Sequence, residues 1–159
     1  DGSSQTAVDA IVSSRAPHGF LGIGGDGQAC MVHTIGNPYV HLVLRGGRTG
    51  TNYDNASIQS ALQQLESAGV PASLIVDCSH GNSNKDHTKQ AVAFRDVVRQ
   101  RKDGQEGILG CMLESNLFPG NQNLGSDPSK LEYGVSITDA CVGWDETEEL
   151  LTWAHGELR

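Results

Sequence analysis

The alternation of apolar and polar positions predicts three short strands that alternate with helices. Apolar runs cover residues 41–44, 72–76 and 108–113, and turn or polar residues follow each run. After each of the first two runs, apolar residues recur at helical spacing. Repeated strand–helix units form parallel sheets, so we expect an α/β fold in which the carboxyl ends of the strands share one edge.

Four helices are expected from the spacing of apolar positions and from start signals. The second helix would bury one face against the sheet. In the last helix, Asp145 would be the N-cap and Glu148 would complete a capping box. The predicted starts of the four helices are Ser3 or Ser4, Asp54 or Asn55, residue 84 and residue 145.

Residues 20–34 are predicted to form a β-hairpin ahead of the first strand of the sheet. A short apolar run at 20–23 and a returning segment at 28–34 flank a glycine-rich turn at 24–27. These glycines do not match a nucleotide-binding fingerprint, which requires a helix to follow. We therefore assign residues 1–159 to a single domain, with the hairpin as an insertion at about residues 20–40.

Residues 115–136 form a long polar stretch that is rich in Gly, Pro and Asn. Structureless connections of this length are usually functional or disordered. Because the stretch follows the third predicted strand, we expect it to lie over the carboxyl edge of the sheet as a lid.

Composition narrows the function classes. The net charge of −8 argues against a nucleic-acid-binding surface, although a site can still be locally basic. No apolar run approaches membrane-spanning length, and no secretory leader is visible. The four cysteines form no CxxC pair, which favours structural thiols in a reducing compartment and hence a cytoplasmic location.

Polar side chains that can bind a metal ion or an anion follow the predicted strands. Arg45, His80 and Glu114 each close an apolar run, and 35 and 34 residues separate them. Asp139 adds a second carboxylate to the same edge. One imidazole and two carboxylates suit a divalent ion such as Mn²⁺, Fe²⁺, Co²⁺ or Zn²⁺, without a choice among them.

Arg45 precedes Gly46 and Gly47, a combination that suits an oxyanion such as phosphate. The spacing of these residues therefore indicates metal-assisted chemistry on a phosphorylated small molecule. The alternative is an α/β domain with ordinary polar loop residues.

Five segments of the chain resemble the type I 3-deoxy-D-arabino-heptulosonate 7-phosphate (DAHP) synthases. The resemblance runs over essentially the whole chain, in the order and spacing of that family. The segments are residues 44–47, 77–83, 112–117, 120–122 and 136–144.

The resemblance implies a (β/α)₈ TIM barrel that condenses phosphoenolpyruvate with erythrose 4-phosphate, the first step of the shikimate pathway. It also implies a divalent metal ion and a homo-oligomer. By motif, His80, Glu114 and Asp139 would be three of the four metal ligands of the family. Arg45 would bind the phosphate of phosphoenolpyruvate.

The predicted hairpin resembles an extra β element of the family, which helps to form a site for feedback inhibition by an aromatic amino acid. Phe20 and Gly22 fall where that effector site would lie. The resemblance does not identify the amino acid.

The chain also departs from the family pattern. The fourth metal ligand of the family is a cysteine in a Gly-Pro-Cys context, which this sequence lacks, and several phosphate-binding lysines and arginines are missing too. We therefore expect the chain to be the C-terminal portion of a longer enzyme, with about three strand–helix units and the hairpin. Cys78 is considered as a substitute ligand because it lies two residues before His80.

Two other functions fit the same residues. The chain could be a non-catalytic or regulatory remnant of such an enzyme. It could also belong to a related synthase that acts on another phosphosugar.

Overall fold

The computed structural model describes residues 3–159, and its centre is a three-stranded parallel sheet. The strands are β3 (Leu42–Leu44), β4 (Leu74–Asp77) and β5 (Ile108–Met112), and the sheet order is β3-β4-β5. The parallel register pairs Val43 with Ile75 and Val76 with Cys111. The predicted α/β fold with a parallel sheet is therefore confirmed.

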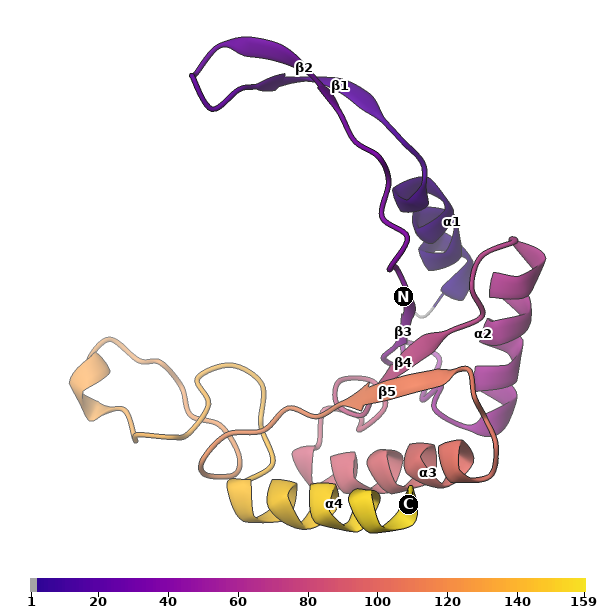
Figure 1. Cartoon of the computed structure of the whole chain (residues 1–159). Coiled ribbons are helices and arrows are strands. Elements are labelled where there is room, and N and C mark those ends of the chain that lie inside the picture. Colours follow the sequence, from indigo (N-terminus) through magenta and orange to yellow (C-terminus); the bar gives the residue numbers. More distant parts are fainter. Residues whose placement is uncertain (1–2) are drawn as a thin grey trace.

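Helices connect the strands and cover the sheet. In chain order they are α1 (Ser4–Arg15), α2 (Asn55–Ser67), α3 (Gln90–Lys102) and α4 (Trp144–Glu157). Figure 1 shows α1 and α2 at one end of the sheet, and α3 and α4 side by side along the other.

The buried apolar side chains form two clusters. The larger cluster joins α1 and α2 to all three strands, with Ile58, Leu65 and Leu74 fully buried. The smaller cluster joins α3 and α4 to the sheet through Phe94, Leu150 and their neighbours. Both clusters fix the strands from behind, so that the loops after the strands are held on a rigid base.

The second helix forms as its sequence predicts. Asp54 is the N-cap, and its side chain accepts hydrogen bonds from the backbone N–H and the hydroxyl of Ser57. The face that its apolar spacing predicts is buried, and its residues are Ile58, Ala61, Leu62 and Leu65.

The third and fourth helices begin at other residues than the sequence suggested. Residue 84 was expected to start a helix, but the chain turns there in a left-handed conformation. A short 3₁₀ turn, η1 (His87–Lys89), then leads into α3. In α4 the N-cap is Gly143, so Asp145 lies in the first turn. The helix starts earlier because Thr147, whose N–H and hydroxyl both donate to the carbonyl of Gly143, closes the first turn.

The predicted hairpin is present. Strands β1 (Gly19–Ile23) and β2 (Ala29–His33) pair antiparallel, and the pair extends away from the sheet (Figure 1). Phe20, Leu21, Ile23 and Met31 are exposed on it. The strands of the hairpin form a separate sheet and make no strand pairing with β3, β4 or β5.

The connection from β5 to α4 is a long loop that hydrogen bonds hold in shape. The Gln122 side chain donates to the carbonyls of Glu132 and Val135 and accepts from the N–H of Glu132. A short 3₁₀ turn, η2 (Pro128–Lys130), lies at its outer end, far from the sheet (Figure 1). The expected lid is therefore wrong for the outer half of the loop, whereas its inner ends border the site described below.

Within residues 3–159, no helix is both long enough and apolar enough to cross a bilayer.

Candidate metal and anion site

The loop after β4 is folded back by the side chain of Asp77, the last residue of the strand. Its Oδ1 atom accepts from the backbone N–H of Ser79 at 2.9 Å and from the Ser79 hydroxyl at 2.7 Å. Asp77 is 4% exposed, so these bonds satisfy a carboxylate that is almost fully buried. The turn brings His80 out of the core at the carboxyl edge of the sheet.

A buried asparagine joins this turn to the end of β3. The Asn82 amide donates to the carbonyls of Leu44 at 3.1 Å and Asp77 at 2.8 Å. The Oδ1 atom of the same side chain accepts from the backbone N–H of Asn52, and the backbone N–H of Asn82 donates to the carbonyl of Arg45. One side chain therefore sets the position of the Arg45 loop relative to the His80 loop.

Three predicted ligand residues come together at this edge. The Nε2 atom of His80 lies 3.4 Å from Oε1 of Glu114 and 3.6 Å from Oδ2 of Asp139. One ligand atom from each of the three residues lies within 4.8 Å of the other two. Ligands about 2.1 Å from one ion are separated by up to about 4.2 Å, so both distances from His80 match joint coordination.

The imidazole of His80 is oriented by the carboxylate behind it. Oδ2 of Asp77 lies 2.7 Å from Nδ1 of His80. Because a carboxylate only accepts, Nδ1 carries the proton and Nε2 presents a lone pair to Glu114 and Asp139. Three negative or electron-rich groups that face one point repel each other unless a cation lies between them, so the donor set fits a divalent metal ion.

The two carboxylates are held differently. Glu114 follows β5, and its backbone N–H and C=O both bond the buried side chain of Gln90 at the start of α3. Asp139 comes from the inner end of the long loop, and its side chain is 66% exposed. Burial, together with the negative charges of Glu114 and Asp139, raises the pKa of the neighbouring Cys141 thiol.

Arg45 lies at the end of β3 and lines a pocket beside His80. The backbone at Gly46 adopts φ +71°, and its N–H donates to Asn52 at 2.7 Å. A Cβ at Gly46 would lie 2.5 Å from the carbonyl carbon of Gly81, so only glycine allows this close approach of the two loops.

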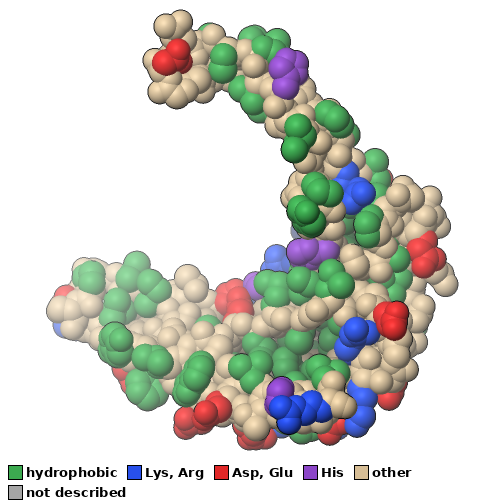
Figure 2. Space-filling model, viewed as in Figure 1, with side chains coloured by type: hydrophobic (Ala, Val, Ile, Leu, Met, Phe, Trp, Pro, Cys, Tyr) green, Lys and Arg blue, Asp and Glu red, His purple; other side chains and the backbone are tan. Residues whose placement is uncertain are grey.

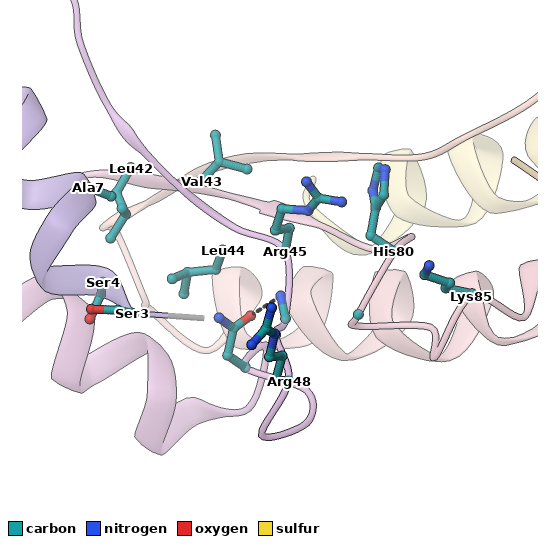
Figure 3. Close-up of a pocket in the computed structure, with 14 residues that line it drawn as sticks. Ser3, Ser4, Ala7, Leu42, Val43, Leu44, Arg45, Arg48, His80 and Lys85 are labelled. Carbon is teal, nitrogen blue, oxygen red and sulfur yellow. Dashed lines mark hydrogen bonds between the residues drawn. The ribbon is translucent and has the colours of Figure 1, made fainter. Parts of the chain in front are cut away.

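This pocket has a volume of about 590 Å³, within the range of small-molecule sites. Arg45, Arg48 and Lys85 line it, and none of its lining residues in the described part of the chain is acidic. Figure 3 shows Arg45 and His80 pointing the same way from adjacent loops, with Lys85 beyond His80. The prediction that Arg45 and His80 share one edge is confirmed.

The metal-ligand cluster borders a second pocket. Its lining includes the three ligand residues together with Asn121 and Lys85. Figure 2 shows histidine, basic and acidic side chains next to one another on the inner, concave side of the molecule. His80 and Lys85 line both pockets, which makes the basic pocket and the acidic cluster parts of one site.

The loop between His80 and Lys85 has an unusual backbone. Within residues 3–159, the non-glycine residues with positive φ are His80 (48°), Asn84 (55°) and Lys85 (60°). Such conformations cost about 1–3 kcal/mol each and cluster at functional sites. The strain is therefore concentrated in the loop that carries the imidazole.

Other predicted residues lie elsewhere. Phe20 and Gly22 are on the hairpin, which extends away from the sheet (Figure 1). Cys78 is fully buried among Ala93 and Phe94, in the cluster behind the sheet. Its thiol belongs to the core, and a hydrogen bond with Cys111 and burial raise its pKa. The suggestion that Cys78 replaces a metal ligand is therefore wrong. It required a regular strand from Cys78 to His80, but β4 ends at Asp77 and the Cys78 side chain lies in the core.

Four residues of the site were not singled out from the sequence for the roles they have here. Asp77 orients His80, Asn82 joins two loops, Gln90 fixes the backbone of Glu114 and Lys85 lines both pockets. A polar residue in an otherwise apolar helix start was the available signal for Gln90. The contact of Asp77 with His80 lies within one turn, whereas the roles of Asn82 and Lys85 depend on segments that are distant in the sequence.

The fold and the site together define a parallel α/β protein with a histidine–carboxylate cluster and a basic pocket at the carboxyl edge of its sheet. The chain belongs to the DAHP synthetase I family, whose model matches residues 2–152. The predicted family resemblance is therefore confirmed.

Individual relatives agree with this assignment. A Tyr-sensitive phospho-2-dehydro-3-deoxyheptonate aldolase of Salmonella typhimurium is 46% identical over 99% of this chain. A phenylalanine-inhibited enzyme of the same name from Saccharomyces cerevisiae is 40% identical over 95% of this chain. The chain spans less than half of these relatives, 44% and 42% of their lengths.

A solved structure matches the whole described fold. The phospho-2-dehydro-3-deoxyheptonate aldolase of Francisella tularensis SCHU S4 superimposes with a TM-score of 0.92 at 39% identity. The match covers 99% of this chain and 46% of that protein.

Proposed function

We propose that this chain carries the metal-binding part of a 3-deoxy-7-phosphoheptulonate synthase, which condenses phosphoenolpyruvate with erythrose 4-phosphate to give DAHP and phosphate. The observation that carries the proposal is the convergence of His80, Glu114 and Asp139 beside the pocket of Arg45. Family membership and the names of the relatives support the same reaction.

In this proposal, His80, Glu114 and Asp139 hold a divalent ion of the Mn²⁺, Fe²⁺, Co²⁺ or Zn²⁺ type. When bound, such an ion polarises a carbonyl group and stabilises negative charge that develops on its oxygen. The protein residues bind and orient: Asp77 fixes the ring of His80, and Arg45 holds the phosphate of phosphoenolpyruvate through charged hydrogen bonds.

The three parallel strands would be part of a (β/α)₈ barrel. Both β3 and β5 are edge strands within the described residues, and each offers one unpaired side to a neighbouring strand. We propose that residues 1–159 act as one domain, with the hairpin as an insertion, in a cytoplasmic homo-oligomer.

An aromatic amino acid is proposed as the inhibitor, bound at the hairpin near Phe20 and Gly22. Two relatives carry Tyr-sensitive and phenylalanine-inhibited in their names. Phe20 is half exposed, so its ring is available to stack on an aromatic ligand.

The decisive experiment measures Mn²⁺ binding by electron paramagnetic resonance in the unaltered chain, in His80→Ala and in His155→Ala. His155 is exposed in the last turn of α4, does not belong to the cluster and serves as the matched control. We expect His80→Ala to weaken Mn²⁺ binding at least about tenfold and the control to leave it unchanged. Equal binding by all three chains would contradict the ligand assignment.

Turnover is tested in this chain joined to the unmatched portion of the Francisella tularensis relative. Consumption of phosphoenolpyruvate should require erythrose 4-phosphate and stop when a chelator removes the metal. Faster reaction with arabinose 5-phosphate would instead identify a synthase for another phosphosugar. Metal binding without turnover would favour a regulatory remnant.

A further inference from the structure

We propose that Lys85 is a substrate-binding residue that contacts an anionic group, either phosphate or carboxylate, where the basic pocket of Arg45 meets the His80–Glu114–Asp139 cluster. This inference rests on the proposed function and extends it to a residue for which neither the family motifs quoted above nor the spacing gave a role. It starts from the position of Lys85, which lines both the basic pocket and the pocket of the metal-ligand cluster.

The backbone fixes Lys85 relative to the imidazole. The N–H of Lys85 donates to the carbonyl of His80 at 2.7 Å, which closes the loop between them. The Ser83 hydroxyl also donates to this carbonyl, at 3.3 Å. Figure 3 shows Arg45, His80 and Lys85 in this order along the basic pocket. A substrate that extends from Arg45 past His80 would therefore meet the side chain of Lys85.

The charge of Lys85 is available for a ligand. Within residues 3–159, Lys85 forms no ion pair, whereas Lys89, Lys102 and Lys130 are paired with Asp86, Glu157 and Asp127. The basic pocket contains no acidic lining residue in a protein whose net charge is −8. Unbalanced positive charge in a concave site attracts anions.

The conformation of Lys85 gives an independent reason. Its φ of 60° lies in the left-handed region, where glycine or asparagine is accommodated far more easily than lysine. Asn84, the preceding residue, has the same conformation and suits it. A lysine at a position that its backbone disfavours is explained if its side chain contributes to binding.

The experiment is a calorimetric titration of the 159-residue chain with phosphoenolpyruvate, inorganic phosphate and pyruvate. The variants are Lys85→Gln, which removes the charge, and Lys89→Gln as the matched control on the adjacent 3₁₀ turn. We expect Lys85→Gln to weaken phosphoenolpyruvate binding about tenfold, since a charged hydrogen bond is lost. Lys89→Gln should change it by less than about twofold, because Lys89 is exposed and outside both pockets.

The smaller probes identify the group that Lys85 contacts. If Lys85→Gln weakens pyruvate binding and not phosphate binding, the contact is to the carboxylate. The reverse pattern assigns it to the phosphate. Both results support the proposal, whereas unchanged phosphoenolpyruvate affinity in Lys85→Gln, or no saturable binding by the unaltered chain, would overturn it.

A third variant separates binding from structure. Lys85→Gly relieves the left-handed strain, so its thermal midpoint should rise while its affinity for phosphoenolpyruvate falls as in Lys85→Gln. Lys85→Arg, which keeps the charge, should restore most of the affinity. A purely structural lysine would instead show parallel changes in stability and binding.

Failure of this inference and failure of the proposed function give different results. Lys85→Gln should leave Mn²⁺ affinity within about threefold, because the ligand atoms remain in place. If His80→Ala weakens Mn²⁺ binding but Lys85→Gln leaves the affinity for phosphoenolpyruvate unchanged, only this inference is rejected. Anion binding that depends on Lys85 without Mn²⁺ binding rejects only the metal assignment.

Discussion

Oδ2 of Asp77 lies 2.7 Å from Nδ1 of His80, and this contact joins the last residue of a buried strand to the imidazole of the site. It fixes both the ring orientation and the tautomer, because the Nδ1–H group donates a hydrogen bond to the carboxylate. The Ser79 hydroxyl, which bonds the other oxygen of Asp77, holds the carboxylate in place.

Replacement of Asp77 by asparagine tests this contact. We expect Asp77→Asn to weaken Mn²⁺ binding by about 10- to 100-fold, since the ring loses its orienting charge while the shape is kept. Asp103→Asn, at the exposed end of α3, is the control. Electron paramagnetic resonance titration measures both, and equal affinities would show that Asp77 serves only the fold.

Loss of the Asn82 side chain should destabilise the protein. In Asn82→Ala, the carbonyl of Leu44 and the N–H of Asn52 lose a partner in a region that is largely shielded from water. We expect the free energy of unfolding to fall by about 2–3 kcal/mol. Urea unfolding measures the change, with exposed Asn123→Ala as the control. A change below 1 kcal/mol, taken as the lower limit for one lost buried bond, would contradict this role.

Gly46 and Gly69 have the same backbone conformation and different surroundings. The φ values of Gly46 and Gly69 are +71° and +69°. A Cβ at Gly46 would collide with the backbone of Gly81 and Asn82, whereas a Cβ at Gly69 would have no atom within 4 Å. Gly69→Ala should cost only the conformational strain, about 1 kcal/mol. Gly46→Ala should cost roughly 3 kcal/mol or more and also lower affinity for phosphoenolpyruvate.

Urea unfolding of the two glycine variants distinguishes clash from strain. Similar losses of stability in both variants would mean that the loops of Arg45 and His80 separate easily. The binding data would then show whether the close approach of these loops is needed for the site.

The helix cap at Asp54 should make the free energy of unfolding depend on pH in the acidic range. Hydrogen bonds from Ser57 lower the pKa of the Asp54 carboxyl from its usual value of 3.8, and the bond from the Ser57 hydroxyl contributes more than the bond from its N–H. A lowered folded-state pKa stabilises the protein above pH 3.8, and this contribution is lost as the pH falls through the folded-state value. Asp54→Asn, which still caps, should lack this pH dependence.

Two measurements check this expectation. Nuclear magnetic resonance titration should find the pKa of Asp54 below 3.8 and closer to 3.8 in Ser57→Ala. Urea unfolding should show that the stability difference between the unaltered chain and Asp54→Asn changes only below about pH 4. A difference that is constant over this range would refute the linkage.

Much of the architecture follows from the sequence because it depends on local patterns. Alternating apolar runs and helical spacing predict β3, β4 and β5, and the turn glycines predict the hairpin. Since parallel strands place their carboxyl ends together, the sequence also predicts that Arg45, His80 and Glu114 share one edge. The start of α3 was missed because the left-handed turn continues from Asn84 into Lys85, a residue type that is rarely left-handed and so gives no local signal for the turn.

The sequence by itself determined which residues lie at the carboxyl edge of the sheet, because strand periodicity and strand ends are local properties. Only the tertiary structure decided how those residues act together. The bridge of Asn82 and the place of Lys85 in the lining of two pockets depend on loops that approach from different strands. Such contacts arise from the packing of the whole sheet and its helices, so no local pattern in the chain specifies them.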